Sequence, residues 1–314
     1  MAYFNIADAT FSKSIAAQGS IPTGITWNND GSKLYEVDFN SGPIYEYDVS
    51  TPYDIDTAVF SKSINTQDSN PTGITWNGDG SKLYEIGQGS DLIYESDVST
   101  PYDIGTATFS KSIDTQDVYP SGITWNNDGS KMYEVGYNGD KIYESDVSTP
   151  YDIATATFSQ SINTQDAYPA GITWNNDGSK MYEVGFSGAK IYESDVSTPY
   201  DIATAVFSKS IDTQDSFPTG MAWNGDGSKM YEVGQGSDLI YEYDVSTPYD
   251  IATATYSQSI NTQDSIPTGM AWNNDGSKMY EVGNSSDKIY EYDITPAQPP
   301  TVTASPIAHI LQMI

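Results

Sequence analysis

The strongest constraint on the fold is a repeat of 49 residues that runs along almost the whole chain. The six tryptophans are spaced by this period, each inside a TWN or AWN triplet: Trp27, Trp76, Trp125, Trp174, Trp223 and Trp272. A fixed period of this length is typical of a solenoid, an array or a propeller, in which each repeat packs on its neighbours. The copies span residues 4–294 of 314 and therefore predict one closed body rather than two ordinary domains.

Each repeat contains the pattern of four short strands. In the copy that starts at Tyr119, YPSGITWN predicts the first strand, and the following Asn-Asp-Gly predicts a tight turn because Asp-Gly accepts positive φ. SKMYEVG, DKIYESDVS and YDIATATFSQSI, residues 130–136, 140–148 and 151–162, predict the other three strands. No 3.6-residue periodicity is present, which excludes a helical solenoid. The sequence predicts an all-β fold, a six-bladed β-propeller of four-stranded antiparallel blades.

The repeat is out of phase with the ends of the chain. Residues 4–15, FNIADATFSKSI, match the outer strand of a repeat, whereas the last copy ends with its third strand at residues 288–294. We expect the N-terminal strand to complete the last blade, because this closes the ring and removes an exposed sheet edge. The predicted domains are the propeller, residues 1–294, and an extended Pro- and Thr-rich tail, residues 295–314.

Charge and composition argue against several function classes. The chain has 43 acidic residues against 13 lysines and no arginine, which gives a formal net charge of −30. Such a surface repels phosphate backbones and anionic membranes, and it lacks the side chain best suited to bidentate phosphate binding. We therefore expect no nucleic-acid partner. The absence of cysteine leaves neither a disulfide framework nor a thiolate metal site.

The two ends of the chain carry no membrane-spanning pattern. MAYFNIADATFSKS has neither a basic region nor a continuous apolar core, so no secretory signal is expected. The terminal IAHILQMI is apolar but far shorter than the roughly 20 residues that span a bilayer, so no membrane insertion is expected. We expect this segment to dock on a partner protein or on its own copies. The alternatives are folding back on the propeller and disorder, and His309 is expected to be packed. The docking residues are Ile307, Ile310, Leu311, Met313 and Ile314.

The copies differ mainly in two loops. The residue before the proline that opens the first strand is, in turn, Ile21, Asn70, Tyr119, Tyr168, Phe217 and Ile266. The loop between the second and third strands reads DFNSGP, GQGSDL, GYNGDK, GFSGAK, GQGSDL and GNSSDK. In a propeller both loops lie on one face, around the mouth of the channel.

Aromatic side chains at these variable positions are the candidate ligand-binding surface. They are Tyr119, Tyr137, Tyr168, Phe186 and Phe217. Flat aromatic faces stack on sugar rings or contact proteins with little loss of side-chain entropy. The alternative is that these rings only cover the packing of the blades.

Acidic side chains recur in every copy. Glu134 and Glu144 represent a pair that strand alternation directs between blades; such pairs act as acid and base or bind cations. Six equivalent pairs instead favour a structural role, with hydroxyl groups or lysine as partners. Asp146 and Asp152 flank Ser-Thr-Pro and suit either calcium or turn capping. We predict no cofactor and no metal site, with Ca²⁺ as the alternative.

Catalysis has little support in the repeat. The predicted propeller lacks His, Cys and Arg, so neither a Ser-His-Asp nor a Cys-His arrangement can form. A glycosidase needs carboxylates placed asymmetrically around one pocket, and Asp38 and Asp56 are the clearest acids specific to one copy. We predict no catalytic residue and no enzyme activity. A carboxylate-dependent glycosidase or a lactonase-like enzyme is an alternative.

The stretches PAGITWNNDGSKMYEVG (169–185) and LIYEYDVSTPYDI (239–251) resemble the repeats of the YVTN-like family of β-propellers. They also resemble near-identical repeats in tail-fibre and other virion proteins of phages, notably marine ones. The resemblance implies a non-enzymatic virion structural protein, a tail fibre, spike or capsid fibre or decoration, assembled in the host cytoplasm and released by lysis. Its tail would hold other virion proteins, or assemble a homo-oligomer, while one propeller face attaches to a host-surface glycan or protein receptor. The alternative is a secreted cellular lectin or adhesin.

Overall fold

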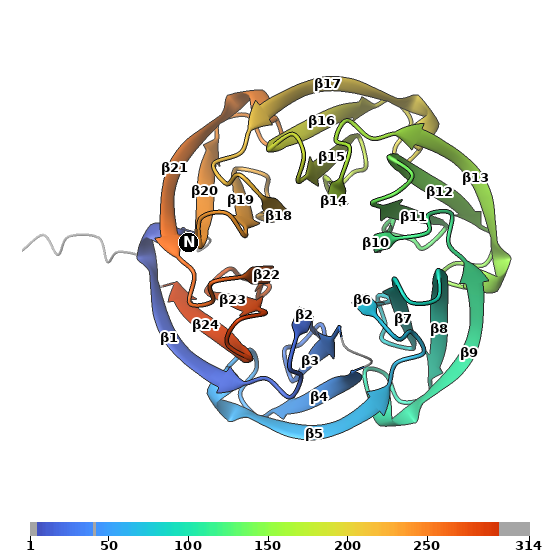
Figure 1. The fold of residues 1–314 in the computed structure, drawn as a ribbon, viewed down its shortest axis with the longest axis vertical. Helices are drawn as coiled ribbons and strands as arrows, with labels where there is room; N and C mark the ends of the chain where they lie inside the picture. The colour runs from blue at the N-terminus through green and yellow to red at the C-terminus, as the bar shows by residue number, and fades with distance from the viewer. Residues whose placement is uncertain (1–4, 40–41, 295–314) are drawn as a thin grey trace, which may run out of the picture.

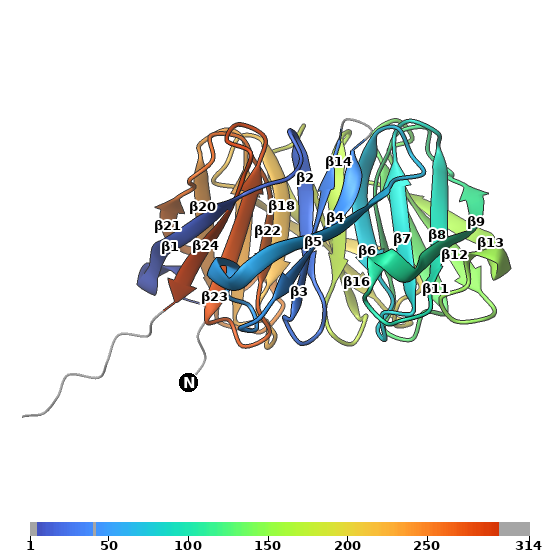
Figure 2. The same cartoon turned by 90° about the horizontal axis from the view of Figure 1, so that it is seen from below.

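The computed structural model describes residues 5–39 and 42–294, which form six four-stranded antiparallel sheets arranged in a ring (Figure 1). Each sheet is one blade, with its first strand beside the central channel and its fourth strand on the outside. Seen from the side, the ring is a disc with loops on its two faces (Figure 2). The predicted fold class is therefore confirmed.

Within five blades the strands follow one another in sequence. Blade one contains β2 (Pro22–Trp27), β3 (Lys33–Asp38), β4 (Pro43–Val49) and β5 (Ala58–Asn65). Blade two contains β6 (Pro71–Trp76), β7 (Lys82–Gly87), β8 (Leu92–Val98) and β9 (Ala107–Asp114). Blade three contains β10 (Pro120–Trp125), β11 (Lys131–Gly136), β12 (Lys141–Val147) and β13 (Ala156–Asn163). Blade four contains β14 (Pro169–Trp174), β15 (Lys180–Gly185), β16 (Lys190–Val196) and β17 (Ala205–Asp212). Blade five contains β18 (Pro218–Trp223), β19 (Lys229–Gly234), β20 (Leu239–Val245) and β21 (Ala254–Asn261).

Blade six is assembled from both ends of the described chain. It contains β22 (Pro267–Trp272), β23 (Lys278–Gly283), β24 (Lys288–Ile294) and, as its outermost strand, β1 (Ala9–Ala16). β1 pairs antiparallel with β24, so that Ala9 lies opposite Ile294 and Ala16 opposite Lys288 (Figure 1). The prediction that the N-terminal strand completes the last blade is confirmed.

The fourth strand of each blade begins later than the sequence pattern predicts. In blade three the predicted strand 151–162 opens with a turn and a 3-10 helix, η4 (Ile153–Thr155), and β13 begins only at Ala156. The cause is local: Tyr151 has φ of 61°, and the Asp152 carboxylate caps the helix by accepting from the Ala154 N–H at 3.0 Å. The same short helix recurs before every fourth strand, as η1 (Ile6–Asp8), η2 (Ile55–Thr57), η3 (Ile104–Thr106), η5 (Ile202–Thr204) and η6 (Ile251–Thr253).

The predicted Asp-Gly turn is confirmed, and it also requires glycine for a tertiary reason. Gly129 has φ of 73°, as expected for such a turn. A Cβ atom at this position would lie 2.3 Å from the ring of Tyr151. The turn between the first two strands therefore packs directly on the turn that precedes the fourth strand.

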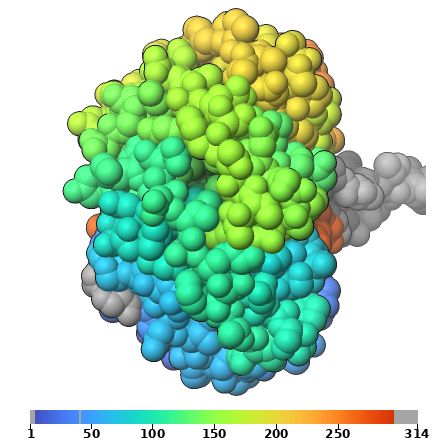
Figure 3. All heavy atoms as spheres, turned by 90° about the vertical axis from the view of Figure 1, so that its right-hand side faces the viewer, coloured from blue at the N-terminus to red at the C-terminus, as the bar shows by residue number. Residues whose placement is uncertain are grey.

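The core of the protein lies between blades. The side chains of Tyr133, Val135 and Ile142 in blade three pack on those of Met181 and Ile202 in blade four, and every other interface repeats this arrangement. Because each blade supplies one face to each neighbour, both faces of every blade are covered only when the ring is complete. On the side of the disc that Figure 3 shows, the atoms of successive blades lie directly against one another.

No helix within residues 5–39 and 42–294 is long and apolar enough to cross a membrane. The predicted docking residues Ile307, Ile310, Leu311, Met313 and Ile314, and His309, lie outside the described residues. The predicted domain boundary at residue 294 also coincides with the end of the described part and stays a prediction.

Candidate functional site

The two variable loops of each blade meet at one mouth of the channel. The backbone N–H of Tyr137 donates to the carbonyl of Tyr119 at 3.0 Å, and Phe186 donates to Tyr168 at the same distance. The remaining four blades have the equivalent bond. The position before the proline and the second residue of the loop between the second and third strands are therefore neighbours in every blade.

A cavity of about 320 Å³ opens at this face, and we call it the channel mouth. Each blade contributes the second residue of its first strand and one residue of the loop after its second strand; Ile21 completes the lining. These residues are Thr23 and Phe39, Thr72 and Gln88, Ser121 and Tyr137, Ala170 and Phe186, Thr219 and Gln235, and Thr268 and Asn284.

The structure divides the five predicted aromatic residues into two groups. Tyr137 and Phe186 line the channel mouth, with ring centroids 6.0 Å apart and an interplanar angle of 35°. Tyr119, Tyr168 and Phe217 are 53%, 56% and 56% exposed and lie outside the cavity lining. The predicted surface is thus an inner aromatic pair and an outer aromatic arc on blades three to five.

Sequence reasoning missed one aromatic residue of the mouth. Phe39 lines the cavity from blade one, which lies across the ring from blade four (Figure 1). It occupies the same repeat position as Tyr137 and Phe186, so alignment of the copies by their 49-residue period was the signal that could have found it.

The lining of the mouth consists of hydroxyl, amide, aromatic and aliphatic groups. The hydroxyl groups donate to backbone carbonyls of the neighbouring strand and not into the cavity. Thr219 donates to the Val233 carbonyl at 3.2 Å, and Ser121 donates to the Val135 carbonyl at 3.1 Å. Their remaining lone pairs can accept from a ligand. Burial raises the pKa of Tyr137 further above its ordinary alkaline value, so its hydroxyl is a proton donor throughout the neutral range. The mouth is therefore a mixed polar and aromatic surface in a strongly acidic protein.

Buried aspartates hold the two loops of the mouth together. Asp117, 3% exposed, accepts hydrogen bonds from the N–H groups of Tyr119 at 2.8 Å and Gly139 at 2.6 Å. A Cβ atom on Gly136 would lie 2.5 Å from this carboxyl group, so glycine makes room for it. The same pairing of an aspartate with a glycine recurs in blades two to six.

In blade one the pair is exchanged. Gly19 stands at the aspartate position and Asp38 at the glycine position, and the Asp38 carboxylate accepts from the Ile21 N–H at 2.7 Å. A Cβ atom on Gly19 would lie 2.2 Å from that carboxylate. Asp38, which the sequence marked as an acid specific to one copy, thus has the loop-holding role of Asp117. Asp56, the other such acid, lies 3.2 Å from Lys13 on the outside of the ring.

The paired glutamates are structural, as predicted, but only in part with the predicted partners. Glu144 is fully buried and accepts from the Lys131 ammonium, as expected, and from the Ile202 N–H of the next blade at 2.9 Å. Glu134 accepts from two backbone N–H groups, those of Gln116 at 2.9 Å and Asp117 at 2.7 Å. Backbone donors had no signature in the sequence because they depend on how the loop folds back.

The two aspartates considered for calcium have separate lysine partners. Asp146 lies 2.8 Å from Lys131, and Asp152 lies 2.6 Å from Lys111 of the preceding blade. Turn capping by Asp152 is confirmed, whereas calcium, the alternative to the prediction of no metal, is not tested by the structure. Among the residues that the structure describes, no group of three or more His, Cys, Asp or Glu side chains is placed to hold a metal ion.

Folding stability is expected to fall as the pH rises from about 5 to 8. Burial raises the pKa of Glu85, Glu134 and Glu183 from 4.5 to about 7. The folded protein therefore keeps protons that the unfolded chain loses above pH 4.5, and each glutamate costs up to about 3 kcal/mol by pH 8. Urea unfolding at fixed salt measures this slope. Repulsion among the acidic residues also lowers stability as the pH rises, but salt near 1 M screens it. A free energy of unfolding that does not change with pH at this salt concentration would therefore contradict the raised pKa values of the three glutamates.

Comparison with known proteins identifies the fold and no family. No protein-family model and no curated protein matches the chain. Solved structures do resemble it: a protein from Lactobacillus plantarum has a TM-score of 0.64 and 15% identity over 87% of this chain and 80% of that one. The Cps50 (Swd1) β-propeller domain of Myceliophteria thermophila has a TM-score of 0.63 and 11% identity, covering 91% and 100%. A candidate 6-phosphogluconolactonase from Bacteroides fragilis has a TM-score of 0.61 and 12% identity, covering 83% of this chain and 76% of that one. At these identities the likeness defines the class of protein, a β-propeller, and nothing finer.

Proposed function

We propose that the protein is a non-enzymatic recognition propeller that binds a carbohydrate at the channel mouth. The observation that carries this proposal is the composition of the mouth: an aromatic pair beside hydroxyl and amide groups, in a cavity of about 320 Å³. Aromatic faces stack on the apolar side of a sugar ring, and hydroxyl and amide groups pair with its hydroxyls. The outer arc of Tyr119, Tyr168 and Phe217 extends this surface for a longer chain.

The biological setting that we propose is a phage virion. The near-identical acidic repeats, their resemblance to those of virion proteins and the apolar end of the chain support this setting. The propeller would then present the channel mouth to a glycan or protein on the host surface, while residues 295–314 hold other virion proteins. A secreted lectin or adhesin would use the same surface.

An enzyme of the lactonase or glycosidase type would need carboxylates in the mouth. The recurring glutamates of the second and third strands are instead buried between blades, and Asp38 is bonded to the Ile21 backbone. Assays with lactones and aryl glycosides are therefore expected to show no turnover above background. Turnover that Asp38→Asn abolishes would overturn the non-enzymatic proposal.

Binding to a polysaccharide panel and to candidate host cells tests the recognition surface. The variant Tyr137→Ala/Phe186→Ala, which removes the aromatic pair of the mouth, is expected to lose about tenfold or more in affinity, since each stacked aromatic contributes about 1 kcal/mol. The control changes two residues of the same face that lie outside the lining of the channel mouth: Asn70→Ala/Ile266→Ala. We expect near-normal binding by the control. Equal loss in both variants, or no binding by the wild type to any surface, would contradict the proposal.

A further inference from the structure

The blades differ at one buried position of the third strand. Blades one, five and six have tyrosine there, Tyr47, Tyr243 and Tyr292, each 2% exposed. Blades two, three and four have serine: Ser96, Ser145 and Ser194. The chain thus contains both a filled and an unfilled version of the same interface between neighbouring blades.

In the tyrosine blades the phenol group has a defined partner. The Tyr47 hydroxyl donates to the Glu36 carboxylate at 2.6 Å, and Tyr243 donates to Glu232 at 2.5 Å. In blade two the equivalent Glu85 keeps its two backbone donors, the N–H groups of Gln67 at 3.0 Å and Asp68 at 2.6 Å. Ser96 is too short to reach the place of the tyrosine hydroxyl, so the third donor is missing.

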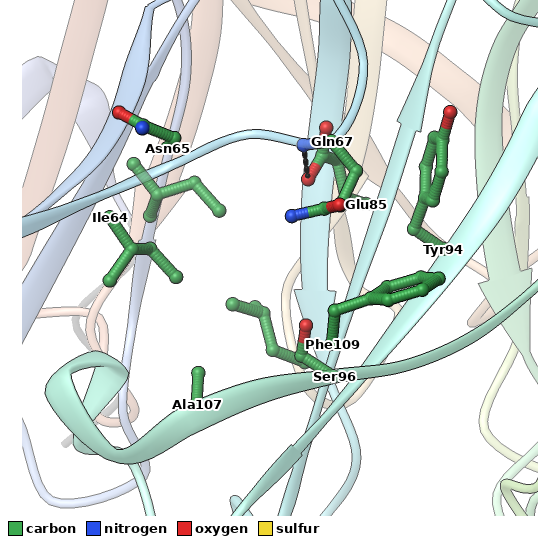
Figure 4. Close-up of a pocket in the computed structure, with 10 residues that line it drawn as sticks. Ile64, Asn65, Gln67, Glu85, Tyr94, Ser96, Ala107 and Phe109 are labelled. Carbon is green, nitrogen blue, oxygen red and sulfur yellow. Dashed lines mark hydrogen bonds between the residues drawn. The ribbon is translucent and has the colours of Figure 1, made fainter.

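A cavity of about 80 Å³ lies where the tyrosine ring is missing in blade two. Figure 4 shows Glu85, Ser96 and Phe109 around this space, with Ile64 of blade one on the opposite side. Of the ten lining residues, eight are identical to their counterparts one repeat earlier in the ring. The two exceptions are Ser96, whose counterpart in blade one is Tyr47, and Asn65 of blade one, whose counterpart in blade six is Ala16.

We propose that this cavity binds a small phenol, whose ring replaces the missing tyrosine ring and whose hydroxyl donates to Glu85. The interface of blade one shows the geometry that the ligand would adopt. There the rings of Tyr47 and Phe60 lie 6.3 Å apart at 79°, an edge-to-face contact that Phe109 is placed to repeat. The buried carboxylate selects a hydroxyl donor over a plain hydrocarbon, because hydrogen bonds to charged groups are the stronger ones.

The size of the cavity restricts the ligand to a single ring. An apolar protein cavity of about 150 Å³ holds benzene, whereas 80 Å³ alone holds two or three waters. Entry of a phenol therefore needs a small outward movement of Phe109, whose ring covers the cavity and is 48% exposed. Blades three and four have Met132 and Met181 where blade two has Leu83, and the unbranched, flexible methionine side chain is better able to fill an irregular gap. The strongest site is thus in blade two.

Titration of the full chain with phenol at pH 8, followed by calorimetry and by ligand-observed NMR, tests the site. We expect saturable binding, and binding of benzene weaker by about tenfold or more, since benzene has no donor. Ser96→Tyr fills the cavity and is expected to abolish the strongest site, whereas the matched control Ser96→Ala leaves the cavity open and keeps it. Failure of phenol to bind the wild type, or unchanged binding by Ser96→Tyr, would overturn the proposal.

A gain-of-function variant keeps the proposal testable if Ser96→Tyr does not fold. Tyr47→Ser opens the equivalent space beside Glu36 in blade one and is expected to lower the thermal midpoint. Added phenol should then restore part of the loss and bind at one further site, because ligands stabilise the state they bind. A midpoint that phenol leaves unchanged in this variant would show that the space holds only water and would overturn the proposal.

Discussion

A chain that begins at Gln18 is expected to lose the closed ring and with it most of its stability. Such a chain lacks η1 and β1, so β24 becomes an open sheet edge. It also lacks Ile6, which is fully buried against blade five and donates its N–H to the buried Glu242 at 2.7 Å. The loss is expected to approach the about 5–15 kcal/mol that holds a typical domain together. Urea unfolding and sedimentation measure the unfolded fraction and any edge-to-edge association.

The matched control for this truncation is a circular permutant. Residues 5–17 are reattached after Ile294 through Ser-Thr-Pro-Tyr, the linker that joins Val245 to Asp250 in blade five, and the chain again begins at Gln18. Every strand pairing of the native ring is then available. We expect stability close to that of residues 1–294. A truncated chain as stable and monomeric as the permutant would refute the closing role of β1.

Replacement of Lys131 by methionine is expected to cost about 3–5 kcal/mol, because it leaves a fully buried carboxylate without its cation. Lys131 contacts Glu144 at 2.5 Å, and the other side chain bonded to that carboxylate is the neutral Gln160 amide at 3.0 Å. In blade two the equivalent Glu95 is bonded to Lys82 and also lies 3.4 Å from Lys111. Lys82→Met should therefore cost clearly less.

Urea unfolding of the two methionine variants measures this difference, and Gln160→Lys supplies the rescue. Gln160 occupies the position of Lys111, so a lysine there places a second cation beside Glu144. In the Lys131→Met background we expect Gln160→Lys to recover a large part of the loss. Equal costs for Lys131→Met and Lys82→Met, or no recovery, would argue against a role for the cation in holding the carboxylate.

Much of the fold could be predicted because the six copies of the repeat can be compared with one another, which removes doubt about the secondary structure of each short segment. A single short apolar run does not distinguish a strand from a buried helix, but the same run in six copies at one spacing does. The Asp-Gly turn was predictable because Gly129 meets a backbone requirement that is local. The 3-10 helix at Ile153–Thr155 was not, since its residues continue the alternation of the strand and only the capping by Asp152 and the contact with blade two separate it.

The sequence predicted which face of the disc carries the candidate site, but not which residues line its cavity. Tyr119 and Tyr137 were expected on the same face because propeller topology brings their loops together, and the hydrogen bond between them confirms it. The inner pair and the outer arc occupy two different repeat positions. The sequence does not show which of these positions lies nearer the channel axis, because that depends on how each loop folds. Phe39 occupies the repeat position of Tyr137 and Phe186, but its loop, DFNSGP, differs from theirs at most other positions, which hides the correspondence.

The sequence by itself determined the number of blades, the order of strands and the phase that closes the ring, because each follows from periodicity and local turn chemistry. Tertiary structure alone decided which polar groups meet. The exchange of Gly19 and Asp38 and the cavity left by Ser96 concern contacts between segments that are far apart along the chain. Such contacts depend on side-chain volume and on the direction of hydrogen-bond donors, and both are defined only once neighbouring blades and loops are packed together.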